Sequence, residues 1–132
     1  MNRTNKTLLI YEPQKAISIA VRRSPIHRWG LYASSFISQH EVLEEAPYFS
    51  VPAEQINQAP VCDQYTYWLS ESELLIGMGY AGLYNHSSSP NAAYQIDYVN
   101  ELIRHYAIRD IREGEEITID YGEDNVKAFN LH

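Results

Sequence analysis

The chain has 132 residues with 10 basic and 17 acidic side chains, and its formal net charge is -7. This length suits one domain with a single hydrophobic core, so we expect one domain over residues 1–132. The single cysteine, Cys62, excludes an internal disulfide framework and a cysteine-rich zinc site. The histidines show no ligand-like spacing with Cys or Asp, so we expect no metal.

The same composition indicates in which compartment the protein acts and which kind of partner it binds. No apolar run approaches the ~20 residues that span a bilayer, and the N-terminus lacks the apolar segment of a signal peptide. We therefore expect an intracellular protein without a membrane partner. The acid surplus argues against direct nucleic-acid binding, which relies on Lys and Arg meeting phosphates. It favours a basic partner, with a solvated acidic surface as the open alternative.

The apolar residues alternate mostly with a period of two, which predicts a mainly β chain with little helix. A half-buried strand is expected over 17–21, a short apolar piece over 30–33, and a strand over 41–45 that Pro47 ends. Further strands are expected over 94–98, 102–108 and 117–121. One or two helical turns are expected near Gln55-Ile56 and again over 65–69.

Three polar segments stand out between these elements. Asn85-His86-Ser87-Ser88-Ser89-Pro90-Asn91 is rich in side chains that bond nearby backbone groups. Glu113-Gly114 predicts a turn before the strand that stops at Asp120-Tyr121-Gly122. A third segment, His27 to Ala33, holds a Trp followed by a Gly. Taken singly, each segment has a purely structural alternative: the first fits a polar turn between strands, the second a hairpin with a solvated acidic face, and the third a turn glycine beside a core aromatic. The 11 Tyr residues fit strands and a polar-lined pocket equally well.

Taken together in this order, the three segments resemble the SET-domain family of protein lysine methyltransferases. The resemblance covers a core of about residues 17–123 and leaves a C-terminal tail, 124–132. It implies a SET-domain fold of several short curved sheets with a knot-like C-terminal core. It also implies a methyl transfer from S-adenosyl-L-methionine to a lysine of a basic, histone-like protein or peptide.

The resemblance assigns the cofactor site residue by residue. The family's Lys-Gly-x-Gly-Leu segment matches His27, Trp29 and Gly30, whereas Arg28 replaces the usual first glycine. The family's Asn-His motif matches Asn85 and His86, and Gly82 stands where an Arg is common. In the tail, Phe129 is the candidate for covering the adenine, with a core contact as the alternative. Asn91 is expected to fix the knot-like core.

The catalytic tyrosine of the family matches Tyr121. Tyr48 is our second catalytic candidate, because it follows two glutamates near where the family keeps a Tyr. Ile119 and Tyr106 are the candidates for the substrate-lysine channel. Ile119 stands where Phe or Tyr is common, and it favours the addition of more than one methyl. We expect the acidic residues of this segment, Glu115, Glu116 and Asp120, to have no catalytic role.

The chemistry explains why this equipment suffices. A lysine with a reference pKa of ~10.4 is neutral in only about four molecules in ten thousand at pH 7. A desolvating channel beside a sulfonium cation lowers that pKa, so the site needs no strong base. With one cysteine, the chain cannot carry a zinc-bound flank, so its own tail or a homodimer partner must close the pocket. The alternative is a catalytically inactive SET-like module that binds a peptide or a cofactor.

Overall fold

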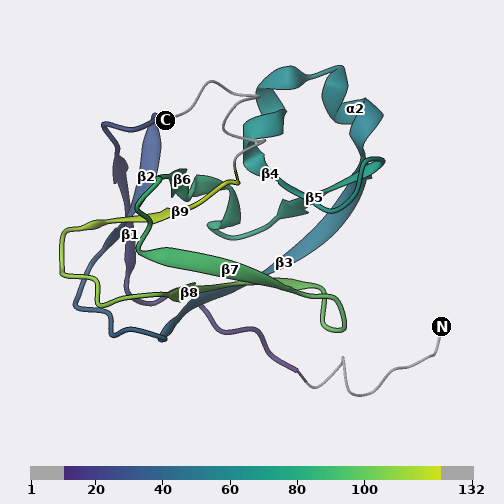
Figure 1. Cartoon of the computed structure of the whole chain (residues 1–132). Helices are drawn as coiled ribbons and strands as arrows, with labels where there is room; N and C mark the ends of the chain where they lie inside the picture. The colour runs from purple at the N-terminus through teal and green to yellow at the C-terminus, as the bar shows by residue number, and fades with distance from the viewer. Residues whose placement is uncertain (1–10, 123–132) are drawn as a thin grey trace.

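The computed structural model describes residues 11–122, and this part of the chain is mainly β (Figure 1). The strands form two sheets, and strands of both sheets alternate along the sequence with a few short helical segments between them. The elements are β1 (Ile19–Arg23), β2 (Trp29–Ala33), β3 (Val42–Pro52), α2 (Ala53–Asn57), η1 (Pro60–Tyr65), β4 (Thr66–Trp68), β5 (Glu73–Gly77), η2 (Ala81–Leu83), β6 (Asn85–His86), β7 (Ala92–Asp97), β8 (Leu102–Ala107) and β9 (Glu116–Ile119). The prediction of a mainly β chain with little helix is confirmed.

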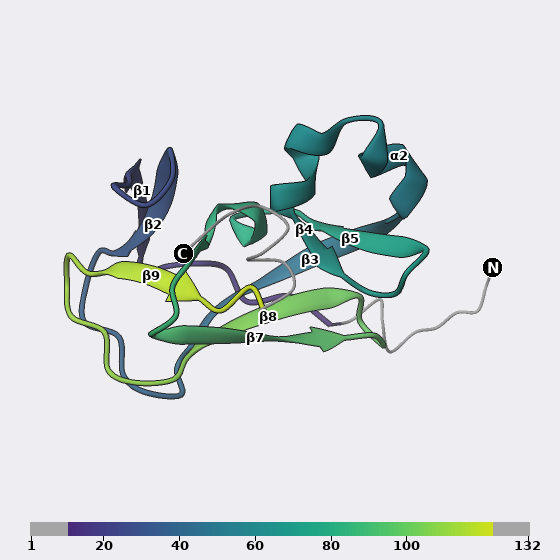
Figure 2. The same cartoon turned by 45° about the horizontal axis from the view of Figure 1, so that its top comes forward.

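The strands form a four-stranded sheet of order β1-β2-β9-β6 and a five-stranded sheet of order β4-β5-β3-β8-β7. Seen in two views, the sheets lie at different levels, and α2 lies beside the β4–β5 end of the larger one (Figures 1 and 2). One buried apolar cluster takes side chains from both sheets, including Leu31 and Ile117 from the first and Ala46, Leu75 and Ile103 from the second. Burial of this shared core stabilises the arrangement.

The long strand β3 joins two halves of the larger sheet. Its first part pairs with β8 and its last part, from Tyr48 to Pro52, pairs with β5. Our prediction that Pro47 ends this strand is wrong. Proline has no N–H to give to a ladder, but Pro47 lies where β3 leaves β8 and joins β5. There its carbonyl still accepts a hydrogen bond from Met78 N at 2.7 Å.

Two other predictions need correction. The first strand begins at Ile19, and Ile17 lies before it with 82% of its surface exposed. The expected helical turn over 65–69 is strand β4, because Thr66, Tyr67 and Trp68 pair with β5. β-branched and aromatic residues suit a pleated surface, and here tertiary pairing decides the conformation. The helical turn expected near Ile56 is confirmed as α2.

A short parallel pair brings the Asn-His segment beside the C-terminal strand. Asn85 pairs with Thr118 and His86 with Ile119. The side chain of Asn91 adds a second link, because its Nδ2 donates to Glu116 O at 2.8 Å and its Oδ1 accepts from Thr118 N at 2.9 Å. Asn91 is 2% exposed, so these bonds are shielded from water. Two motifs about 30 residues apart are thereby locked together.

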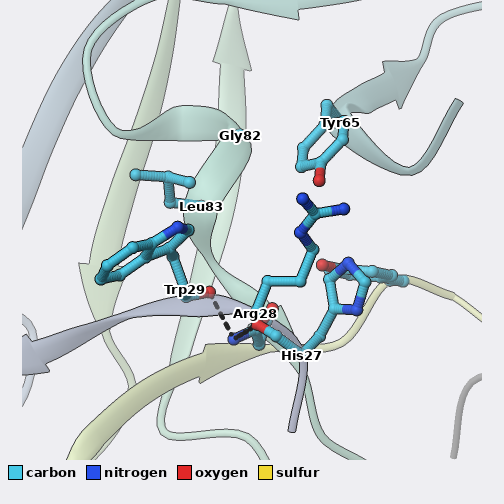
Figure 3. Close-up of a pocket in the computed structure, with 8 residues that line it drawn as sticks. His27, Arg28, Trp29, Tyr65, Gly82 and Leu83 are labelled. Carbon is cyan, nitrogen blue, oxygen red and sulfur yellow. Dashed lines mark hydrogen bonds between the residues drawn. The ribbon is translucent and has the colours of Figure 1, made fainter. Parts of the chain in front are cut away.

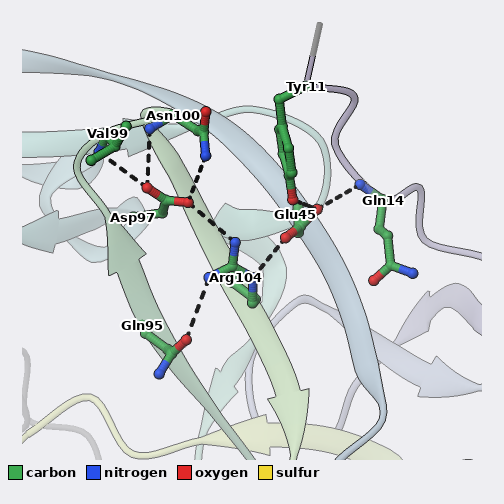
Figure 4. A network of polar contacts seen from close by, with 8 residues as sticks. All are labelled: Tyr11, Gln14, Glu45, Gln95, Asp97, Val99, Asn100 and Arg104. Atoms are coloured by element: carbon green, nitrogen blue, oxygen red, sulfur yellow. Dashed lines mark hydrogen bonds and ion pairs between the residues drawn. The ribbon is translucent and has the colours of Figure 1, made fainter. Parts of the chain in front are cut away.

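A polar network ties the N-terminal part of the described chain to the larger sheet (Figure 4). Glu45 accepts hydrogen bonds from Tyr11 Oη at 2.5 Å, Gln14 N at 2.8 Å and Arg104 Nε at 2.6 Å. Arg104 also contacts Asp97 at 3.2 Å. Burial opposes ionisation of Glu45, but the three donors prevail and lower the pKa of its carboxyl. The network is structural and lies on β3, β7 and β8, away from the pocket described next.

Candidate functional site

A pocket forms where the β1–β2 loop meets the end of η1, η2, β6 and Tyr121, the second residue after β9 (Figure 3). All the segments that the sequence singled out contribute to it. Its lining consists of His27, Arg28, Trp29, Tyr65, Gly82, Leu83, Asn85 and Tyr121. The structure therefore brings together four of the predicted site residues, from three separate parts of the sequence.

The amide of Asn85 is fixed on one wall of this pocket. Its Nδ2 donates to Trp29 O at 3.0 Å, to His27 O at 3.3 Å and to Glu116 Oε2 at 2.8 Å. An amide nitrogen carries only two hydrogens, so the longest contact, the one with His27 O, shares a hydrogen with one of the other two acceptors. With the nitrogen held in this way, the amide has one orientation, and its Oδ1 remains as the acceptor that a ligand can use.

Glu116 is the residue that the sequence reasoning missed. Its carboxylate collects Asn85 Nδ2, Ser24 Oγ at 2.8 Å and 2.9 Å, and Tyr32 Oη at 3.2 Å. These donors come from three segments, and no local pattern indicates that they meet. Glu116 is the first residue of β9, and the alternation of a strand places its side chain on the other face from that of the buried Ile117. That Glu116 has no catalytic role stays a prediction; the structure shows that its carboxylate holds the Asn85 amide.

Gly30 is required by the same contacts. A Cβ atom at this position would lie 2.3 Å from Glu116 Oε2 and 2.9 Å from Asn85 Nδ2. Real Cβ atoms do not approach so closely, so any other residue would push the carboxylate and the amide apart. The glycine of the β1–β2 hairpin thus permits the close approach of three strands at the pocket wall.

His86 and Tyr121 form a second fixed pair. His86 Nδ1 accepts a hydrogen bond from Tyr121 N at 3.1 Å, so a neutral imidazole carries its proton on Nε2. The two rings are tilted against each other with centroids 5.3 Å apart. The Tyr121 hydroxyl donates to Tyr84 O at 2.7 Å. Both ends of Tyr121 are therefore held, by His86 and by Tyr84, the two neighbours of Asn85 along the chain.

Burial raises the pKa of Tyr121 to about 12, with smaller contributions from Tyr65 and the negative charge of Glu116. The phenol is accordingly neutral at any physiological pH. It can donate a hydrogen bond and orient a partner, but it is a poor base for removing a proton.

A buried polar cluster, defined here as Glu44, Tyr67, Tyr84 and His105, lies behind the Tyr121 acceptor. Tyr84 Oη donates to Glu44 Oε1 at 3.0 Å, and its ring stacks on His105 with centroids 3.9 Å apart. Tyr67 Oη contacts His105 Nε2 at 2.8 Å and donates to Ala81 O at 2.6 Å. Burial raises the pKa of Glu44 despite its hydrogen bonds from Tyr80 and Tyr84. The cluster fixes Tyr84 and therefore the carbonyl that Tyr121 contacts.

The remaining predicted residues lie elsewhere. Tyr48 is on β3, where burial and then Glu101 raise the pKa of its hydroxyl, and it does not line the pocket. Tyr106 is on β8, paired with Ala93 of β7, and does not line it either. Ile119 is 2% exposed and belongs to the apolar core behind His86. Phe129 lies outside the described residues.

One polar atom of the pocket lacks a partner. His27 Nε2 is buried and makes no hydrogen bond with the described residues. A buried nitrogen of this kind costs free energy unless something satisfies it, so it is suited to a polar ligand. Over residues 11–122 no group of three His, Cys, Asp or Glu side chains could hold a metal ion. Within the same range no helix is long and apolar enough to cross a membrane.

Comparison with known proteins gives consistent results. The family model "SET domain" matches residues 28–122. The chain is 31% identical over 97 residues to an H3 lysine-37 specific histone-lysine N-methyltransferase of Schizosaccharomyces pombe, a match that covers 71% of this chain and 66% of that protein. It is 32% identical over 111 residues to an H3 lysine-4 specific enzyme of Aspergillus oryzae, covering 75% of this chain and 9% of that protein.

A solved structure agrees with the fold. A crystal structure of a candidate histone methyltransferase from Plasmodium falciparum superposes with a TM-score of 0.70 at 30% identity, covering 83% of this chain and 96% of the other. The chain thus spans about two thirds of one curated relative and about a tenth of another. The motifs, the strand order that brings them together and the match over residues 28–122 lead to one conclusion: the chain belongs to the SET domain family.

Proposed function

We propose that the chain is an S-adenosyl-L-methionine-dependent protein lysine N-methyltransferase that acts on a histone or a similar basic protein. The observation that carries this proposal is the meeting of the Asn85 amide and the Tyr121 hydroxyl at one pocket, each held by backbone partners. The relatives named as histone-lysine N-methyltransferases support the reaction and the substrate class. An intracellular site of action follows from such a substrate.

The pocket lining fits the polar end of the cofactor. The Oδ1 of Asn85 and the carbonyls of His27 and Trp29 are acceptors suited to an ammonium, and the buried His27 Nε2 has no hydrogen-bond partner within residues 11–122. His86 lies next to this wall and fixes Tyr121. When bound, the cofactor supplies a methyl group on a positively charged sulfur. The role of the chain is to hold it in one orientation and to exclude water.

Tyr121 is proposed as the catalytic residue. Its hydroxyl stays neutral because burial raises its pKa to about 12. A neutral phenol beside the acceptor lysine can orient the amine, and the Tyr84 carbonyl that it contacts is a preformed dipole for the same region. The lysine must arrive uncharged, which a desolvated channel next to a cation promotes. Among residues 11–122 the pocket lining has no carboxylate, in keeping with a reaction that proceeds without a protein base.

The roles of Ile119 and Phe129 rest on the resemblance of the sequence to the family, and of the two only Ile119 lies within the matched residues 28–122. We propose that Ile119, buried behind His86, limits the end of the substrate channel, and that Phe129 covers the adenine. Tyr48 and Tyr106 have weaker support, since neither lines the pocket. A second copy of the chain is the other candidate for closing the pocket, and analytical ultracentrifugation with and without cofactor distinguishes the two ways of closing it.

Calorimetric titration with S-adenosylhomocysteine tests the site separately from turnover. We expect the wild-type chain to bind, and Asn85→Ala to bind at least about tenfold more weakly, because the ammonium of the ligand loses the Oδ1 acceptor and the Trp29 carbonyl loses its donor. Asn57→Ala, at the exposed end of α2, is the matched control and should bind as the wild type does. Unchanged affinity of Asn85→Ala would remove Asn85 from the site.

The same titration, combined with a methyl-transfer assay on histone peptides, separates the proposal from its main alternative. A binding module would bind S-adenosylhomocysteine and transfer no methyl group to any lysine. An enzyme would bind S-adenosylhomocysteine and would also transfer a methyl group to a lysine of the peptide.

A further inference from the structure

Arg28 combines two unusual properties at the pocket. Its backbone lies in the left-handed region with φ of 44°, where an L-residue other than Gly costs about 1–2 kcal/mol. The conformation is built into the hairpin, since Ser24 N donates to Arg28 O at 2.9 Å and closes the turn. Glycine would adopt this backbone freely. The chain keeps a long charged side chain at a position that suits Gly, and such an outlier at a pocket points to a functional demand.

No carboxylate among residues 11–122 pairs with the charge of Arg28. Within residues 11–122 its guanidinium makes no ion pair and no hydrogen bond. The described residues that line the pocket include no carboxylate, although the chain as a whole carries a net charge of -7. Figure 3 shows the guanidinium extended across the pocket with its end facing Tyr65. Arg28 is exposed at the mouth of this pocket, and its guanidinium is therefore available for an anionic group of a ligand.

Another wall of the same pocket has a glycine, Gly82, and therefore carries no positive charge. Gly82 lines the pocket at a position where the family commonly has Arg. The space there is not tight, because a Cβ at Gly82 would meet Tyr65 atoms at 3.7 Å and 3.8 Å, which are ordinary contacts. The two departures of this chain, a Gly for an Arg and an Arg for a Gly, therefore face one cavity and leave its formal charge unchanged.

We propose that Arg28 binds the carboxylate at the amino-acid end of the cofactor, so that the positive charge comes from the β1–β2 turn instead of position 82. This inference rests on the proposed function and adds a residue to it. A guanidinium offers two parallel donors that match the two oxygens of a carboxylate. Arg28 thereby selects ligands that keep the carboxylate, while the Asn85 wall receives the amine.

A pair of ligands tests this assignment in solution without turnover. Calorimetric titration compares S-adenosylhomocysteine with its decarboxylated analogue, which keeps the amine and the nucleoside. We expect the wild-type chain to prefer the carboxylate-bearing ligand by at least about tenfold, the scale of a charged hydrogen-bond pair. Arg28→Gly should bind the two ligands about equally, and Arg28→Lys should keep part of the preference.

The variants have built-in folding controls. Gly suits a φ of 44°, so Arg28→Gly should melt at or above the wild-type temperature. Arg112→Ala removes an exposed arginine that does not line the pocket and should leave the ratio of the two affinities unchanged. Adding Gly82→Arg to Arg28→Gly returns a guanidinium to the pocket from the other wall and should restore the preference.

The outcomes separate this inference from the proposed function. If the wild type binds both ligands with equal affinity, or Arg28→Gly retains the full preference, the assignment of Arg28 is overturned and the cofactor site stands. If the wild type binds neither ligand, both proposals fall together.

Discussion

His105 provides a quantitative test of the interior behind Tyr121. Burial lowers the pKa of its imidazole from 6.5 to about 3. The folded chain keeps this ring neutral, whereas the unfolded chain takes up a proton below about pH 6.5. The unfolded state thus binds more protons between these values, so the stabilisation is complete above pH 6.5 and is lost as the pH falls toward 3.

The size of the effect follows from the two pKa values. Between pH 7 and pH 5, His105 alone should cost about 2 kcal/mol of unfolding free energy, as the linkage relation gives for these values. For a chain of this length, that corresponds to a drop of about 5–10 °C in Tm. The measurement is thermal and urea unfolding, followed by circular dichroism at pH 7, 6 and 5.

The contribution of other titrating groups is removed by comparing the wild type with a variant that lacks only His105. In His105→Phe the ring can still stack on Tyr84, and the Tyr67 hydroxyl still donates to Ala81 O at 2.6 Å. This variant should lose about 2 kcal/mol less than the wild type between pH 7 and pH 5. His40→Asn, at an exposed histidine, is the matched control and should follow the wild type. Equal losses in the wild type and His105→Phe would refute the reasoning.

Three further substitutions test contacts at and around the site. Gly30→Ala places a Cβ 2.3 Å from Glu116 Oε2, so S-adenosylhomocysteine titration should show at least about tenfold weaker binding; wild-type affinity would contradict the close packing. Asn91→Ala removes two buried bonds to β9 and should cost about 2 kcal/mol in urea unfolding; an unchanged midpoint would contradict the lock. Arg104→Met leaves the Glu45 carboxylate, 5% exposed, without its cation, so urea unfolding should show a loss of about 2–4 kcal/mol. Arg112→Met is its control, and equal midpoints would show the network to be dispensable.

The sequence predicted those parts of the site that depend on local pattern. Alternation located β7, β8 and β9, and the Glu113-Gly114 turn is present with Gly114 at φ of +90°. The motif order identified Asn85, Trp29 and Tyr121, which do meet at one pocket. These features are encoded within short segments, so the residues alone were sufficient.

Long-range pairing explains what the sequence did not predict. The role of Glu116 depends on Ser24 and Tyr32, more than 80 residues away, coming to its carboxylate. Pro47 was read as the end of a strand because the change of partner from β8 to β5 has no local signal. Tyr65 does end a helical segment, η1, but its place in the pocket lining has no signal in the sequence. In each case the tertiary partner decides the outcome.

The central claim is that Tyr121 serves methyl transfer and not the fold. The most direct measurement is transfer of a labelled methyl group from S-adenosyl-L-methionine to histone peptides by the wild type, Tyr121→Phe and the exposed control Tyr98→Phe. We predict that Tyr121→Phe loses about a hundredfold or more in turnover, while its affinity for S-adenosylhomocysteine stays near the wild-type value and its Tm falls only by the few degrees that one lost hydrogen bond costs. Undiminished transfer by Tyr121→Phe would contradict the account.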